Sequence, residues 1–329
     1  MIFNIWLTRR CNLKCIYCYE GENKSTAEMN VSTAIEVIDF IKSYTPGSIS
    51  VNFHGGEPLL AMDMLRYIVD ELESSLENTS IDYGLTTNGT ILNDDIILFL
   101  SKFMPHGLTV SIDGDEMVHD ANRKYANGTG SYKKIEPYLA KIIEAIPDCR
   151  VRATYNHKTI NSLCESVIHL VNKGFKTIVA IGDYYDLSWE DKDEKILKCE
   201  INKLQRFYQS LDNREEIRIN LLDKNLTEYS SCKGGITSVN IDTDGRLYPC
   251  TAAVGKDEYI IGDVKKGINK NRVKEILDLG TEMNEECKTC AIQKSCIGVR
   301  CKLKHKIYSG SCLDIPVFLC VENNAIFDS

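Results

Sequence analysis

The 329-residue sequence contains no long apolar run. No stretch approaches the roughly 18 apolar residues that crossing a bilayer requires, so no membrane-spanning segment is expected. The opening run from Met1 to Leu7 is too short for a signal peptide, and Arg9 and Arg10 follow it instead of preceding it. We therefore expect a soluble, cytoplasmic protein without a membrane partner.

Positive charge is also scarce. The 39 Lys and Arg residues face 47 Asp and Glu residues, which gives a formal net charge of -8. Binding along a phosphate backbone needs a basic surface, so no nucleic-acid partner is expected. The sequence also lacks an internal repeat of fixed period and any low-complexity tract.

Cysteine, in contrast, is abundant, with 14 residues. The reducing cytosol keeps thiols from forming disulfides, and clustered thiols in that compartment usually bind metal. The sequence therefore predicts metal centres.

The length suits one large domain, over residues 1–215, and one small domain, over residues 216–329. In the first, short apolar runs rich in β-branched residues alternate with longer amphipathic stretches, which predicts an α/β fold with a parallel sheet, built as a partial (β/α)6 TIM-type barrel. The expected strands are Phe3 to Leu7, Ser48 to Phe53, Ile81 to Thr86, Gly107 to Ser111, Arg150 to Tyr155 and Phe175 to Ile181. The expected helices are Ser32 to Ser43, Asp63 to Glu77, Asn93 to Lys102, Ser131 to Ala145, Ser162 to Lys173 and Asp191 to Leu211, several of them opened by Asn, Ser or Asp as N-cap.

The pattern changes after about residue 216. A hairpin is expected from Ser238 to Ile241 and Arg246 to Tyr248, with one helix near Arg272 to Leu279. Six cysteines lie between Cys287 and Cys320 in a tail with little apolar material. We expect a small α+β domain held together by metal more than by a core.

Cys11, Cys15 and Cys18 follow the first expected strand with the spacing C-x3-C-x2-C. Such a loop can supply three thiolates to a cubane and leave the fourth iron without a protein ligand. The spacing also suits one helix face, so buried structural thiols or part of a zinc site are the alternatives. The segment, with Tyr17 before the third cysteine, resembles the signature loop of the radical S-adenosylmethionine (AdoMet) superfamily. The resemblance implies a catalytic [4Fe-4S] cluster on these cysteines and AdoMet as a cofactor.

The segment from Gly55 to Pro58 follows the second expected strand and resembles the GGEP motif of this family. Gly55 and Gly56 let the backbone approach a ligand closely, and Glu57 can accept hydrogen bonds from an ammonium group. By itself the segment would be an ordinary turn between a strand and a helix.

Two later segments resemble further contacts to AdoMet. Asn88 follows the third strand, and Ser111 and Arg123 belong to the S-x-D-G and H-D-x-x-R patterns of maturases in this superfamily. The resemblance implies that Ser111 and Arg123 hold the methionine carboxylate and that Tyr17 lies near the adenine. The residues so assigned to AdoMet are Tyr17, Gly55, Gly56, Glu57, Pro58, Asn88, Ser111 and Arg123.

The C-terminal cysteines resemble the SPASM domain of peptide and sulfatase maturases, and structural zinc is the alternative. The resemblance implies two auxiliary iron-sulfur clusters. Cys287, Cys290, Cys296 and Cys320 are assigned to the distal one, and Cys232, Cys250 and Cys301 to the proximal one. No cysteine just upstream of Cys232 supplies a fourth thiolate.

Two arrangements of the proximal cluster follow. Either an open iron binds a substrate cysteine, or Cys312 closes this cluster and Cys320 the distal one. The remaining cysteines, Cys149, Cys164 and Cys199, are expected to be buried packing residues.

The resemblance covers nearly the whole chain and implies reductive cleavage of AdoMet to a 5'-deoxyadenosyl radical that takes a hydrogen atom from the substrate. We expect an oxidoreductase that modifies a ribosomally made (RiPP) precursor peptide. Cross-linking through a cysteine thioether is the first choice, and formation of a carbon-carbon cyclophane bond or epimerisation is the alternative. An anaerobic sulfatase-maturing, formylglycine-forming enzyme is a rival, although Thr251 stands where that family has an aspartate. A non-enzymatic electron carrier would not need the Gly55 to Pro58 element.

Only ten residues precede Cys11, so no leader-binding domain is expected at that end. A separate leader-binding protein, or the barrel rim, would hold the leader. An electron donor such as flavodoxin or ferredoxin is also expected.

Overall fold

The computed structural model describes residues 1–21, 25–44, 47–223, 232–279 and 282–328. The chain divides into two units. The first contains Met1–Asn12, Glu20–Thr87 and Cys232–Gly280, and the second contains Leu13–Tyr19, Asn88–Ser231 and Thr281–Ser329. Within the described ranges, no helix has both the length and the apolar character needed to cross a membrane.

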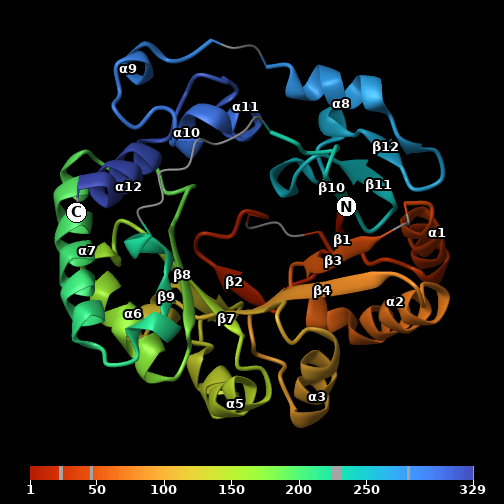
Figure 1. The fold of residues 1–329 in the computed structure, drawn as a ribbon, viewed down its shortest axis with the longest axis horizontal. Coiled ribbons are helices and arrows are strands. Elements are labelled where there is room, and N and C mark those ends of the chain that lie inside the picture. The colour runs from red at the N-terminus through yellow and green to blue at the C-terminus, as the bar shows by residue number, and fades with distance from the viewer. Residues whose placement is uncertain (22–24, 45–46, 224–231, 280–281, 329) are drawn as a thin grey trace. The chain divides into compact units, whose positions relative to one another are not determined.

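The first unit is built on parallel strands joined by helices (Figure 1). Its N-terminal elements are β1 (Ile2–Thr8), α1 (Val31–Lys42), β3 (Ser48–Gly55), α2 (Met62–Ser75) and β4 (Ser80–Thr87). Asn30 caps α1, since its side chain accepts a 2.9 Å hydrogen bond from the Thr33 amide. Apolar side chains of β1, such as Phe3 and Ile5, are fully buried.

The hairpin expected from the sequence extends this sheet. It comprises β10 (Ser238–Ile241) and β11 (Arg246–Tyr248), followed by β12 (Gly262–Asp263), β13 (Gly267–Ile268) and α8 (Lys270–Leu277). β10 pairs with β1 in parallel. A row of amides reinforces the pairing, because Asn52 donates to Asn4 at 3.1 Å and Asn4 donates to Asn240 at 3.2 Å.

The second unit repeats the strand and helix alternation. Its parallel strands are β5 (Leu108–Ser111), β7 (Arg150–Tyr155), β8 (Thr177–Gly182) and β9 (Arg218–Ile219). Its helices up to residue 210 are α3 (Asp94–Phe103), α4 (Glu116–Asn122), α5 (Tyr132–Ala145), α6 (Leu163–Asn172) and α7 (Lys192–Ser210).

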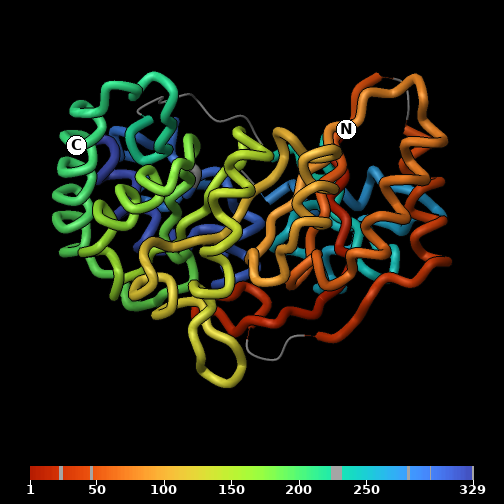
Figure 2. The backbone as a smooth tube through the Cα atoms, turned by 90° about the horizontal axis from the view of Figure 1, so that it is seen from below, coloured from red at the N-terminus to blue at the C-terminus, as the bar shows by residue number. Residues whose placement is uncertain are grey.

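A small two-stranded sheet also belongs to the second unit. β2 (Leu13–Cys15) pairs antiparallel with β6 (Arg123–Tyr125), and Cys15 lies opposite Arg123 in the register. Figure 2 shows β2 beside the loop that carries β6.

The C-terminal helices are α9 (Glu285–Lys288), α10 (Ile297–Arg300), α11 (Lys302–Ser309) and α12 (Val317–Asp328). α12 packs against α7 (Figure 1). Phe318, Val321 and Ala325 are at most 2% exposed, and Tyr155 donates a 2.7 Å hydrogen bond to Glu322. The expectation of a tail with little core is therefore wrong for α12, which packs through an apolar face.

The α/β fold expected from the sequence is confirmed. Each of the six expected strands is present, with β7 at the expected bounds, and so is each of the expected helices to within two residues at either end. Asn93 caps α3 as expected. Ser131 does not cap α5, because its hydroxyl contacts His119 and donates to the Arg123 carbonyl.

Candidate active site

Asp113 is the centre of a hydrogen-bonded group after β5. Its carboxylate accepts hydrogen bonds from the Tyr17 hydroxyl at 2.5 Å, the Arg123 Nε at 3.1 Å and the Thr154 amide at 3.0 Å. Asn122 donates to the same carboxylate at 3.1 Å. A buried carboxylate with several donors is held in one orientation, so Asp113 fixes the side chains around it.

Arg123 brings this group to the cysteine loop. Its Nη1 lies 3.9 Å from the Cys15 sulfur, and its guanidinium lies 5.2 Å from the centre of the Tyr17 ring. Burial opposes the positive charge, but the combined contributions of Asp113, Tyr17 and Cys15 raise the pKa of Arg123. A permanent cation therefore lies beside Cys15, which favours a thiolate there.

Tyr17 remains a hydrogen-bond donor. Burial of its hydroxyl raises its pKa well above the usual range, Asp113 adds to the shift, and Arg123 opposes it. Tyr17 contacts Asp113 through its hydroxyl, and its ring lies near the Arg123 guanidinium. Its expected position near an adenine stays a prediction.

His119 and Asp120, which precede Arg123 in its sequence pattern, hold the segment that carries it. His119 contacts Ser131 through Nε2 at 2.9 Å, and Asp120 accepts hydrogen bonds from the Ser131 and Tyr132 amides. Burial lowers the pKa of His119 to about 4, with Arg123 contributing, so the ring is neutral. These contacts fix β6 at the start of α5.

In the first unit, the segment from Gly55 to Glu57 lies against the backbone that leads into Cys11. The Gly56 amide donates to the Thr8 carbonyl at 3.0 Å, and the Glu57 amide donates to the Arg10 carbonyl at 2.9 Å. A Cβ on Gly55 would collide with Thr8, and one on Gly56 would collide with Arg10. The two glycines thus allow close approach to the protein's own chain, a role that the sequence did not reveal.

Glu57 is 1% exposed, and its Oε1 accepts hydrogen bonds from Thr87 at 2.8 Å and from the Leu59 amide at 3.1 Å. Pro58 is buried directly after it and opens a short 3-10 helix. Hydrogen bonds from Thr87 and from the Leu59 amide therefore hold the Glu57 carboxylate in one orientation.

Two further residues that the sequence assigns to AdoMet belong to the second unit. Asn88 accepts hydrogen bonds from the Thr90 amide at 2.9 Å and hydroxyl at 2.6 Å, which shapes the turn after β4. Ser111 is buried at the end of β5 and lies opposite Arg152 of β7. Their contacts to AdoMet stay predictions.

Sequence reasoning missed Arg9, which joins the end of β1 to the β10–β11 turn. Its guanidinium donates to both carboxylate oxygens of Asp242, at 3.1 and 2.7 Å, and to Glu20 at 3.0 Å. Burial opposes its charge, but the two carboxylates raise its pKa. The segment that enters the cysteine loop is thus anchored to the hairpin before Cys250.

Cys232 and Cys250 belong to the first unit. Gly234, two residues after Cys232, packs on Pro249, since a Cβ on Gly234 would lie 2.5 Å from the Pro249 carbonyl oxygen. The structure thus brings the backbone segments of these two cysteines together.

Four C-terminal cysteines gather in the second unit. Burial and the neighbouring thiols of Cys296, Cys287 and Cys290 raise the pKa of Cys320 to about 11. These are the residues that the resemblance assigns to the distal cluster, and their donor chemistry fits an iron-sulfur centre. Across the described residues, however, no three His, Cys, Asp or Glu side chains already surround a point at metal-binding distance.

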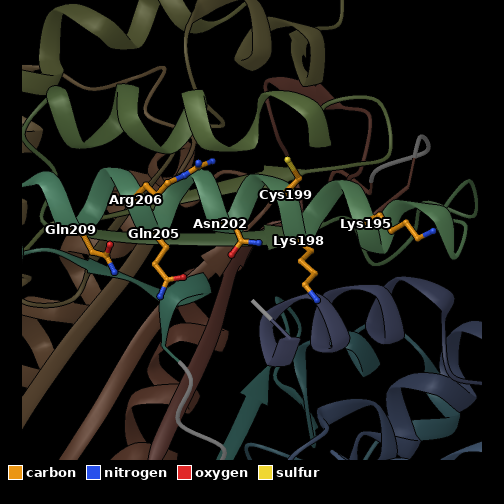
Figure 3. Close-up of a pocket in the computed structure, with 7 residues that line it drawn as sticks. All are labelled: Lys195, Lys198, Cys199, Asn202, Gln205, Arg206 and Gln209. Carbon is orange, nitrogen blue, oxygen red and sulfur yellow. The ribbon is translucent and has the colours of Figure 1, made fainter.

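Of the three cysteines expected to be packing residues, Cys149 and Cys164 are buried. The expectation is wrong for Cys199, which is exposed on α7. Cys199 lines a surface pocket of about 650 Å³ that contains none of the predicted site residues. Figure 3 shows its side chain with the other lining residues on α7. The lining residues are Lys195, Lys198, Cys199, Asn202, Gln205, Arg206 and Gln209.

Comparison with known proteins places this site in a family. Residues 5–161 match the Radical SAM superfamily. The cysteine-type anaerobic sulfatase-maturating enzyme of Clostridium perfringens is 25% identical over 321 residues, which cover 88% of this chain and 85% of that enzyme.

Two solved structures share the fold. Native anSMEcpe with bound AdoMet and Cp18Cys peptide superimposes with a TM-score of 0.82 at 23% identity, over 99% of this chain and 96% of that one. Streptococcus suis SuiB bound to the precursor peptide SuiA gives a TM-score of 0.65 at 18% identity, over 97% and 75%.

Residues 5–161 therefore form a radical SAM domain, and the α/β fold of the chain is that of the radical SAM partial barrel. The chain is related in sequence to the anaerobic sulfatase maturases. The cofactors predicted from the sequence, a [4Fe-4S] cluster and AdoMet, are those of this superfamily.

Proposed function

We propose that this protein modifies a ribosomally made peptide and that it joins a cysteine sulfur to a peptide carbon as a thioether. The observation that carries the peptide substrate is the likeness of nearly the whole chain to two enzymes solved with a bound peptide, anSMEcpe and SuiB.

The cofactor sites follow from the chain's own residues. Cys11, Cys15 and Cys18 would hold the [4Fe-4S] cluster, and Arg123 beside Cys15 supports thiolate there. Ser111 and Arg123 would bind the AdoMet carboxylate, and Glu57 its amine. When bound, the cofactors supply the radical that takes a hydrogen atom and an iron-sulfur acceptor for a second electron.

The thioether reaction balances as a two-electron oxidation. A peptide C–H bond and a cysteine S–H bond are lost, and one C–S bond forms. One hydrogen atom ends in 5'-deoxyadenosine, while the other leaves as a proton and its electron passes to the iron-sulfur acceptor. The protein must orient sulfur and carbon and exclude water.

Formylglycine formation on a cysteine is the second candidate. The sequence relationship to the Clostridium perfringens enzyme over most of both chains favours it. Thr251 argues against formylglycine formation. This exposed residue stands where the family has an aspartate, and its hydroxyl cannot act as a carboxylate base.

The test uses a cysteine-containing precursor peptide, AdoMet and dithionite under anaerobic conditions. A thioether removes two hydrogen atoms from the peptide and blocks alkylation of one thiol. A carbon-carbon bond removes the same two atoms but leaves the thiol reactive, and epimerisation leaves the mass unchanged. Formylglycine replaces the sulfur with an aldehyde oxygen.

A matched Cys→Ser peptide is the control. Equal loss of two hydrogen atoms from both peptides would overturn the thioether proposal. Neighbouring genes give a second indication, since a short cysteine-rich peptide gene favours the thioether and a sulfatase gene favours formylglycine.

A further inference from the structure

Arg152 is a cation of the second unit whose side chain has no partner. It lies on β7, opposite Ser111 of β5. The pair before them, Val110 and Val151, is 0% exposed, and successive side chains of a strand point to opposite faces. Ser111 and Arg152 therefore share the other face of these two strands. Across the residues that the structure describes, the Arg152 guanidinium makes no hydrogen bond and no ion pair.

Arg152 borders the hydrogen-bonded group around Asp113. The Thr154 amide, two residues further along β7, donates to Asp113 at 3.0 Å. Burial, followed by repulsion from Arg123, lowers the pKa of Arg152. A guanidinium still stays protonated at neutral pH, so two positive charges lie near one another here. The Arg152 side chain is nevertheless exposed to solvent, so a bound group can reach it.

The carboxylates already assigned to this site do not neutralise Arg152. Asp113 pairs with Arg123 at 3.1 Å and makes no hydrogen bond to Arg152. AdoMet carries one carboxylate against an ammonium and a sulfonium, and the resemblance assigns that carboxylate to Ser111 and Arg123. A further carboxylate is therefore needed beside Arg152, whose planar fork of donors suits a two-point contact with such a group.

Tyrosines surround Arg152 within this unit. The nearby hydroxyls of Tyr19, Tyr17 and Tyr185 oppose the fall in its pKa. Tyr185 in turn contacts Tyr308 of α11, with 2.6 Å between the two hydroxyl oxygens. Tyr19 is 47% exposed and Tyr308 is 36% exposed. Tyrosine and arginine are the residues that contribute most at peptide and protein recognition sites, so this composition fits the binding of a peptide.

We propose that Arg152 binds a carboxylate of the peptide substrate, from an Asp or Glu side chain close to the residue that is modified. This inference rests on the peptide substrate proposed above and adds the class of peptide. An acidic side chain held at Arg152 fixes the position of the neighbouring target residue, which is how binding energy orients a reacting carbon. Arg152 thus determines specificity and takes no part in bond making.

The test uses a display library of short peptides, each with a central cysteine between random residues. The library is selected on the oxidised, AdoMet-loaded holoenzyme under anaerobic conditions. Wild type should enrich Asp or Glu over Asn and Gln by about tenfold at a position near the cysteine, because a charge-assisted contact contributes about that factor in affinity. Arg152→Gln should lose this preference and keep the AdoMet affinity of the wild type.

Arg150→Gln is the matched control. Arg150 lies on the same strand, is exposed, and donates to the His106 carbonyl at 3.2 Å. Its replacement should leave the preference for acidic peptides intact. Arg152→Met covers the case in which Arg152→Gln does not fold, since it also removes the charge and should lose the preference to the same extent.

A wild-type enzyme that selects no acidic residue would overturn the proposal, as would a preference that survives in Arg152→Gln. Equilibrium dialysis examines the other source of a carboxylate. A tenfold loss of AdoMet affinity in Arg152→Gln would assign Arg152 to the cofactor and would also overturn the proposal. Acidic peptides that bind through Arg152 but are not modified would support its role and contradict the proposed function instead.

Discussion

Arg123 donates a 3.1 Å hydrogen bond from Nε to Asp113, and both side chains are at most 9% exposed. Tyr17 donates to the other carboxylate oxygen of Asp113. The pair directs Nη1 of Arg123 toward the Cys15 sulfur. Asp113 thus positions a cation at the predicted AdoMet site.

Asp113→Asn should weaken AdoMet binding by about tenfold, or about 1.4 kcal/mol, because Arg123 loses its charged partner and its fixed orientation. Anaerobic equilibrium dialysis of the oxidised enzyme measures the effect. Asp115→Asn is the control, since the amide can still accept the hydrogen bond from Val118 that caps α4. Equal affinity in wild type and Asp113→Asn would show that the pair has no part in binding.

The buried pair of Arg9 and Asp242 should matter for stability. Removing one partner of a buried ion pair costs about 3–5 kcal/mol of stability. Glu20 still pairs with Arg9 in the variant, so we expect Asp242→Ala to lower the free energy of unfolding by about 3 kcal/mol. Urea unfolding under anaerobic conditions measures the change. Glu28→Ala, which breaks the exposed pair with Arg10, should cost less than about 1 kcal/mol. Similar costs for both variants would contradict the anchoring role of Arg9.

Many of the strands and helices could be predicted from local patterns of apolar and polar residues in the sequence. The strand β7 has its predicted bounds because Val151, Ala153 and Tyr155 alternate with more exposed residues and so show the period of a half-buried strand. The hairpin strands β10 and β11 also have their predicted bounds, around a turn of Asp and Gly.

Other elements could not be predicted because distant contacts specify them. β2 and β6 have three residues each and exist through their pairing with one another. The sequence predicts a metal-held tail around Cys320, yet this segment forms the helix α12 because its apolar residues pack on α7. Nothing near Arg9 in the sequence indicates that it pairs with Asp242.

His119 should make stability depend on pH. Its pKa is about 4 in the folded protein and about 6.5 when unfolded, so the unfolded chain takes up the proton first as the pH falls. The stability that the neutral His119 contributes is fully present above pH 6.5 and is lost as the pH falls from 6.5 through 4. From pH 7.5 to pH 5.5, the free energy of unfolding of the wild type should fall by about 1.4 kcal/mol more than that of His119→Gln. Urea unfolding at the two pH values measures this difference. Parallel losses in the two proteins would contradict a neutral, buried His119.

Thiol labelling should separate Cys199 from Cys149. Cys199 is exposed, whereas Cys149 is 2% exposed and burial raises its pKa to about 12. Because the thiolate is the reacting form, maleimide should modify Cys199 rapidly and Cys149 only on unfolding. Peptide mapping by mass spectrometry follows both sites, with Cys199→Ser as control. Early modification of Cys149 in the folded protein would contradict its burial.

The central claim is that the Cys11, Cys15 and Cys18 loop holds the cluster at which AdoMet is cleaved. The direct measurement is the formation of 5'-deoxyadenosine after AdoMet and dithionite are added under anaerobic conditions. Wild type and the surface control Cys199→Ala should form it at the same rate, and Cys15→Ala should form none, because two thiolates do not retain a working cubane. Formation by Cys15→Ala at the wild-type rate would contradict the account.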